Sequence, residues 1–140
     1  MLAFDPVTSE ADVQTYKGFG IAIIDENEEA KRRASKRTLF YMPHCEQFLY
    51  NNLVETNFSG EALTRVMVIG NHFSGYRESQ GNEEFSRRSP HIRRILAHLA
   101  KVELPSEKLL ALRHSPYAFN DTCVQYVEQA SVGSIDFTPV

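Results

Sequence analysis

The sequence predicts an α/β fold, a three-layer Rossmann-like sandwich built around a mainly parallel sheet. Two apolar runs, residues 38–42 and 65–69, lack the polar alternation of a half-exposed strand, which is typical of strands covered on both faces. Helical spacing follows the first run, and strands that alternate with helices favour a parallel sheet. In such folds, ligands bind beyond the carboxyl ends of the strands.

The segment at residues 38–58 is predicted to form a buried strand, a tight turn and an amphipathic helix. Pro43 ends the strand because a proline has no N–H to give to a neighbouring strand. His44 and Cys45 lie in the turn, and apolar residues with helical spacing follow it, namely Phe48, Leu49 and Leu53. Two residues able to do chemistry therefore stand at the end of a central strand.

The segment before it predicts a helix and a short strand. Ser9 can cap a helix that runs to about Lys17, and Asp12 can complete the capping box. Residues 20–24 are then expected to form a strand that ends at Asp25.

The second half of the chain predicts fewer regular elements. Residues 73–87 are polar and weakly periodic, so we expect a long loop with at most one helical turn. A serine followed by proline at residue 90 favours a helix start, and its apolar stripe comprises Ile92, Ile95, Leu96 and Leu99. Residues 105–112 suggest a short helix or turn, and residues 122–127 a last strand.

Length and composition indicate one domain at residues 1–128, followed by a polar and loosely held tail at residues 129–140. The net charge of -3 gives no general attraction to nucleic acid or to acidic membranes. No apolar run approaches the ~20 residues of a membrane helix. Two cysteines are too few for a disulfide framework, and no basic segment opens the chain, so we expect a reducing intracellular compartment.

Polar side chains follow three of the expected strands. Asp5 follows a short strand expected at residues 2–4. His44 and Cys45 follow the strand at residues 38–42, and Asn71 and His72 follow the strand at residues 65–69. Right-handed crossovers would bring these ends to one edge, so the residues are expected to line a common rim. An acid in the position of Asp5 holds a ribose in nucleotide-binding folds; the alternative is that it only starts a turn with the proline after it.

His44 and Cys45 allow a nucleophile or metal interpretation. A thiol at a helix N-terminus beside a histidine can have a depressed pKa and hence reactivity. Metal sites need three or four ligands, and no familiar zinc spacing is present. The alternative is a small packed side chain at the start of a helix, and we expect no metal site.

Two further turns carry amide and carboxylate side chains. Gly70 lets the backbone approach a ligand closely, and Asn71 beside it can both donate and accept. Asn120 and Asp121 form a polar cluster before the last strand. The alternative for both places is a tight turn without a ligand.

Several stretches together resemble the SRR family, named for "sensitivity to red light reduced" and also called SRR1-like. The resemblance covers residues 4–127 and is carried by Asp5-Pro6-Val7, Thr38-Leu39-Phe40-Tyr41-Met42-Pro43-His44-Cys45, Leu49-Tyr50-Asn51-Asn52-Leu53, Ile69-Gly70-Asn71 with Phe73, and Ala118-Phe119-Asn120-Asp121-Thr122. His72 departs from the family's usual serine, and Gln125-Tyr126 from its usual His-Trp. The family also carries an earlier strand and helix, so the resemblance implies an N-terminally incomplete domain with an unpaired strand edge that favours self-association.

The resemblance implies a regulatory protein of the cytoplasm, with the nucleus as a second location. Its members are associated with circadian timing and light signalling in plants, and with haem biosynthesis in animals. We expect the protein to bind protein partners, which are unidentified, and a small ligand in addition. We expect it to bind neither nucleic acid nor a membrane. The cofactor is unknown, and a catalytic function is the less favoured expectation. Haem binding through His44 or Cys45 is one alternative. The other is a nucleotide- or small-molecule-binding enzyme that uses the rim of Asp5, His44, Asn71 and Asp121.

Overall fold

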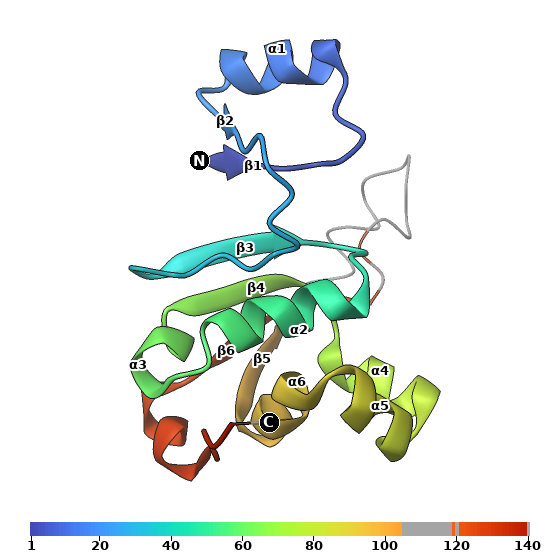
Figure 1. Ribbon diagram of the computed structural model, residues 1–140, viewed down its shortest axis with the longest axis vertical. Helices are drawn as coiled ribbons and strands as arrows, with labels where there is room; N and C mark the ends of the chain where they lie inside the picture. The colour runs from blue at the N-terminus through green and yellow to red at the C-terminus, as the bar shows by residue number, and fades with distance from the viewer. Residues whose placement is uncertain (105–118, 120, 140) are drawn as a thin grey trace. The chain divides into compact units, whose positions relative to one another are not determined.

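The fold of the chain is mixed α/β, and its described residues divide into two compact units. The computed structural model describes residues 1–104, 119 and 121–139 (Figure 1). The units are Met1–Ala30 and Lys31–Val140. Among the described residues, no helix has the length and apolar character needed to cross a membrane.

The first unit is a small strand–helix–strand motif. Strands β1 (Leu2–Ala3) and β2 (Ala22–Ile23) pair in parallel, and helix α1 (Glu10–Gly18) connects them. The predicted capping box is confirmed, because Ser9 N donates to Asp12 Oδ2 at 2.9 Å and Asp12 N donates to Ser9 Oγ at 3.3 Å.

The second unit is built on a mixed four-stranded sheet in the order β3-β4-β6-β5. Strands β3 (Thr38–Met42) and β4 (Val66–Asn71) are parallel, whereas β6 (Thr122–Val127) is antiparallel to both β4 and β5 (Leu99–Glu103). The other elements are α2 (Gln47–Thr56), α3 (Gly60–Leu63), α4 (Phe73–Gln80), α5 (Asn82–Arg88), α6 (Pro90–Ile95), η1 (Leu96–His98) and η2 (Gln129–Ser134).

The core of this unit lies between one face of the sheet and the helices. Val66 and Val68 of β4 are buried, as are Tyr50 and Leu53 of α2, and Figure 1 shows α2 running beside the sheet. Alternation along the strands places the opposite set of side chains on the second face. Exposed apolar residues of that face are Leu39, Tyr41, Met67 and Val102.

The sheet differs from the predicted one in direction and in burial. The expectation of a mainly parallel sheet was wrong, since two of the three pairings in the four-stranded sheet are antiparallel. The expectation that residues 38–42 are covered on both faces was also wrong, because β3 lies at an edge, with Leu39 55% and Tyr41 62% exposed. An apolar run of five residues does not by itself distinguish a central strand from an edge strand with one apolar outer face.

Three other segments differ from the sequence prediction. Residues 73–87 form helices α4 and α5 in place of a long loop, and Leu99 begins strand β5 in place of ending a helix. The segment after residue 128 includes the short helix η2, and Ile135 beyond it is buried, which differs from a loosely held tail. The helix or turn expected at residues 105–112 lies outside the described residues.

Candidate functional site

The end of strand β4 holds a hydrogen-bonded cluster centred on Asn71. The side-chain oxygen of Asn71 accepts a hydrogen bond from the backbone N–H of His44 at 2.7 Å. Its side-chain nitrogen donates to the hydroxyl of Tyr76 at 2.9 Å, and that hydroxyl donates to the carbonyl of Cys45 at 3.2 Å. Asn71 therefore ties the turn after β3 to helix α4 through both ends of its amide.

The backbone of Asn71 is bonded as well. Its N–H donates to the hydroxyl of Tyr50 at 3.1 Å, and the same hydroxyl donates to the carbonyl of Met42. Its carbonyl accepts from the side-chain nitrogen of Gln125 at 2.9 Å, whose oxygen accepts from Phe73 N at 3.1 Å. We call Asn71 and the side chains that bond to it, those of Tyr50, Tyr76 and Gln125, the Asn71 hub.

Gly70 makes room for the Asn71 hub. A Cβ atom at this position would lie 2.8 Å from both Cε1 and the hydroxyl of Tyr50 and 2.9 Å from the Met42 carbonyl, closer than packed atoms approach. The close approach that glycine permits at Gly70 is therefore used by the ring of Tyr50.

Burial raises the pKa of both tyrosines of the hub. The shift at Tyr50 takes its pKa well above the usual range, and the hydrogen bond donated by the N–H of Asn71 opposes it to a smaller extent. Burial likewise raises the pKa of Tyr76, and the hydrogen bond donated by the Asn71 side chain lowers it by a smaller amount. Both hydroxyls therefore remain neutral donors at physiological pH.

His72, the next residue, belongs to a separate surface cluster. Its Nε2 lies 3.0 Å from Glu103 Oε2, and its Nδ1 lies 3.2 Å from the ammonium nitrogen of Lys101. An ammonium group has no acceptor, so Nδ1 accepts from Lys101 and Nε2 carries the proton donated to Glu103. Lys101 also contacts Glu103 at 2.7 Å. This triad of His72, Lys101 and Glu103 links the end of β4 to β5.

A shallow cavity of about 270 Å³ lies beside this triad. Its polar lining comes from Ser74 and Arg77 of α4, Lys101 of β5 and Gln125 of β6. Gln125 is buried and uses its amide within the Asn71 hub. Two cationic side chains and a hydroxyl could contact a small anion there.

Within the second unit, the structure brings several of the predicted site residues together. The backbone N–H of His44 donates to Asn71, and the carbonyl of Cys45 accepts from the hydroxyl of Tyr76, which is itself bonded to Asn71. The N–H of His72 donates to the carbonyl of Asp121 at 3.0 Å. His44 and Asp121 both have left-handed backbones, with φ of 57° and 59°, as tight turns require.

Asp5, the remaining described candidate, lies in the first unit. Its carboxylate accepts from Val7 N at 3.0 Å and its carbonyl from Thr8 Oγ1 at 2.8 Å, which is an Asx turn. Asn120 lies outside the described residues.

The two cysteines occupy different environments. Cys45 is partly exposed and Cys123 is fully buried, and both are free thiols. Burial, reinforced by the charge of Glu103, raises the pKa of Cys123 to about 12, so this thiol stays protonated. In the part of the chain that the structure describes, no three His, Cys, Asp or Glu side chains are placed to hold a metal ion.

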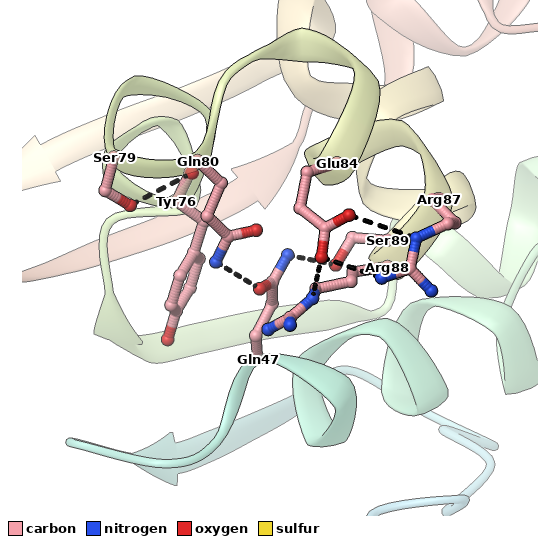
Figure 2. Close-up of polar contacts among 8 residues, drawn as sticks. All are labelled: Gln47, Tyr76, Ser79, Gln80, Glu84, Arg87, Arg88 and Ser89. Atoms are coloured by element: carbon pink, nitrogen blue, oxygen red, sulfur yellow. Dashed lines mark hydrogen bonds and ion pairs between the residues drawn. The ribbon is translucent and has the colours of Figure 1, made fainter.

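A second polar network lies among the helices (Figure 2). Gln47 at the start of α2 donates to Ser89 Oγ at 2.8 Å and accepts from Gln80 Nε2 at 2.7 Å. Gln47 and Ser89 are buried, and Glu84 forms ion pairs with Arg87 and Arg88 beside them. The buried part of this network joins α2, α4 and the α5–α6 junction. Its role is therefore structural.

Sequence reasoning missed the partners of the candidate residues. The buried face predicted for α2 comprised Phe48, Leu49 and Leu53. The structure buries Leu53 but leaves Phe48 49% exposed, and it buries Tyr50, which the prediction did not include. Tyr76 was assigned to a loop, and Lys101 and Glu103 lie on strand β5, which was not predicted. Hydrogen bonds between residues 21 to 54 positions apart leave no local sequence signal.

The elements and the Asn71 hub define a mixed α/β protein whose strand-end polar residues bind one another. A family model described as the SRR1 domain matches residues 1–126. The chain belongs to the SRR1 family. No solved structure gives a significant match.

Three curated relatives show the range of similarity. An SRR1-like protein of Mus musculus is 39% identical over 98 residues, covering 69% of this chain and 39% of that protein. Protein SENSITIVITY TO RED LIGHT REDUCED 1 of Arabidopsis thaliana is 41% identical over 75 residues, covering 54% of this chain and 27% of that protein. An SRR1-like protein of Drosophila melanogaster is 29% identical over 106 residues, covering 76% of this chain and 37% of that protein. The chain thus spans less than half the length of each.

Proposed function

We propose that the chain is a regulatory protein that acts by binding partner proteins in light- or clock-linked signalling. Membership of the SRR1 family supports the regulatory role, and the Arabidopsis relative is named for sensitivity to red light. We propose further that the protein acts in the cytoplasm, with the nucleus as a second location, and that its regulatory role extends to haem biosynthesis. The net charge of -3 supports protein partners over nucleic acid.

The Asn71 hub is the observation that carries this proposal. A catalytic or ligand-binding amide needs a donor or acceptor that points toward its substrate. The Asn71 side chain instead bonds to His44 N and Tyr76, and its backbone to Tyr50 and Gln125. Its polar groups therefore stabilise the two turns that follow β3 and β4, which favours a structural role for the family pattern around it.

A test in plants separates the structural role from chemistry. Arabidopsis plants that lack the relative are given this chain, and the growth response to red light is scored. We expect the wild-type chain to restore the response, as should His44→Asn and His72→Ser. His44 contributes its backbone N–H to the hub, and asparagine tolerates the left-handed φ of 57°; serine at residue 72 can cap α4.

Gly70→Ala serves as the destabilised control and should restore the response poorly. Failure of the folded wild-type chain to restore the response would contradict the proposal. So would loss of the response in either histidine variant at an unchanged melting temperature, because that result would assign chemistry to the imidazole.

The alternative is a protein of this mixed α/β fold that binds a small anionic ligand, and the cavity beside Lys101 favours it. Arg77 and Lys101 are the cationic groups of its lining, although Glu103 offsets the charge of Lys101 at 2.7 Å. Titration with inorganic phosphate and with ATP, followed by NMR, would show saturable shifts at Ser74 under this alternative. Arg77→Ala should abolish these shifts, whereas Arg93→Ala, on a different helix, should leave them unchanged.

A further inference from the structure

Strand β3 is an edge of the four-stranded sheet and pairs only with β4 among the described residues. The N–H of Thr38 donates to the carbonyl of Arg65 at 2.8 Å, so the main-chain groups of Thr38 point toward β4. Main-chain direction alternates along a strand. The N–H and C=O groups of Leu39 and Tyr41 therefore point away from the sheet.

In the part of the chain that the structure describes, strand β3 itself carries none of the sequence features that usually prevent strand pairing. Natural edge strands carry charged side chains, prolines or bulges that block a second strand. Residues Thr38–Met42 contain no charge and no proline, and their register with β4 runs without a bulge. Leu39 and Tyr41 are 55% and 62% exposed on the same face, beside Met67 at 39%.

We propose that β3 is a homodimerisation edge, on which a second copy of this chain pairs its own β3 antiparallel about a two-fold axis at Phe40. In this register Leu39 faces Tyr41 of the second copy, and Tyr41 faces its Leu39. Both are hydrogen-bonded pairs, so the four outward main-chain groups of each copy find partners. The side-chain pairs are aliphatic–aromatic, a favourable cross-strand combination.

The charges of the flanking residues favour the antiparallel direction over the parallel one for two copies of this strand. Lys36 and Arg37 precede the strand. Antiparallel pairing places Arg37 opposite Pro43 of the second copy and Lys36 opposite its His44, so the cationic side chains are kept apart. Parallel in-register pairing would instead place each cation opposite its own copy, which is destabilising. Residues 38–42 themselves are uncharged and cannot repel their copy.

The first test measures the molar mass of the full chain by sedimentation equilibrium over a wide range of concentration. We expect a monomer–dimer equilibrium with a dissociation constant on the order of 10 µM, as for a small interface. Tyr41→Lys should raise this constant at least about tenfold, because it places charge on both symmetric pairs. Val102→Lys is the matched control, since Val102 is 53% exposed on the other edge strand, and it should leave the constant unchanged.

The second test fixes the register without relying on the stability of a charged variant. Directly opposite residues lie about 5.5 Å apart at Cα, within the range that a disulfide spans. Leu39→Cys combined with Tyr41→Cys should therefore form a covalent dimer under mild oxidation. Peptide mass spectrometry should then find a disulfide that joins position 39 of one copy to position 41 of the other. Leu39→Cys alone should not form it. A monomer at every concentration, an equal effect of Val102→Lys, or no such link would overturn the proposal.

Discussion

Asn71 and His72 are adjacent at the end of β4, and their side chains bond to different kinds of partner. Asn71 is bonded at both ends of its amide to partners in the β3–α2 turn and α4. His72 contacts Glu103 and Lys101, whose side chains are 59% and 42% exposed. A part-buried hydrogen bond that loses its partner costs more free energy than an exposed ion pair.

This difference indicates what the family-like residues contribute. The Gly70-Asn71 pair stabilises the arrangement of two strand ends, so replacement there should damage the fold. His72 occupies a position where the resembled family usually has serine, and its surface contacts should be dispensable for stability. The predictions below test this contrast from the largest expected effect to the smallest.

Gly70→Ala should be the most damaging substitution. Its Cβ would overlap the ring of Tyr50 and the Met42 carbonyl, so we expect a loss of roughly 3–4 kcal/mol in unfolding free energy from overpacking and broken hydrogen bonds. Urea denaturation measures this loss. Gly133→Ala is the control, because no atom lies within 4 Å of its Cβ position; an equal loss in both would refute the steric explanation.

Asn71→Ala should remove the amide bonds to His44 N and to the Tyr76 hydroxyl. We expect a cost of about 2 kcal/mol, since the part-buried bond to Tyr76 and the more exposed bond to His44 are both lost. His72→Ala should cost less than about 1 kcal/mol, because its partners are exposed. Equal costs measured by thermal unfolding would remove the contrast between the two residues.

Tyr50→Phe should cost about 1–2 kcal/mol. The change deletes one hydroxyl and leaves the Met42 carbonyl and Asn71 N–H without that partner. Tyr41→Phe, whose side chain is 62% exposed, should stay within about 0.5 kcal/mol of the wild type. Chemical denaturation of both variants compares them, and a neutral Tyr50→Phe would show that its hydroxyl does not stabilise the Asn71 hub.

Glu103 should give the smallest effect, visible only as a pH dependence. The hydrogen bond from Lys101 lowers the pKa of Glu103, burial opposes this shift, and His72 adds to the lowering. Its stabilising contribution is thus present above its unfolded pKa of about 4.3 and is lost as the pH falls through the lower folded value. The difference in unfolding free energy between wild type and Glu103→Gln should be a few tenths of a kcal/mol at neutral pH and vanish in acid.

The control for this effect is the Lys101→Met background. In this background, Glu103→Gln should change the unfolding free energy at neutral pH by a smaller amount, because the ammonium group of Lys101, the principal hydrogen-bond donor to Glu103, has been removed. A difference that grows as the pH falls would have the wrong sign and would contradict the assignment.

The sequence predicted the local elements that have strong apolar periodicity. Strand β3, helix α2 and strand β6 form close to the expected residues, and Ser9 caps α1 as expected. Strand β5 was missed because Leu99 continues the apolar spacing of the preceding helix. That strand carries the antiparallel pairing with β6, so missing it also gave the wrong strand direction.

The site was predictable in position but not in bonding. The expectation that polar residues gather where strands end led to His44 and Asn71, and these two are bonded in the structure. Tyr76 could not be found because residues 73–87 have weak periodicity and were assigned to a loop. Only the tertiary arrangement shows that the Asn71 amide is occupied by protein partners.

Amide hydrogen exchange at His44 tests the central claim most directly. His44 lies in an exposed turn outside the sheet and helices, so its N–H owes protection to the bond with Asn71 Oδ1 at 2.7 Å. We predict slow exchange in the wild type and exchange accelerated at least about tenfold in Asn71→Ala, beyond the acceleration at Leu53 in the core of α2. Fast exchange in the wild type, or equal acceleration at both residues, would show that Asn71 does not hold this turn.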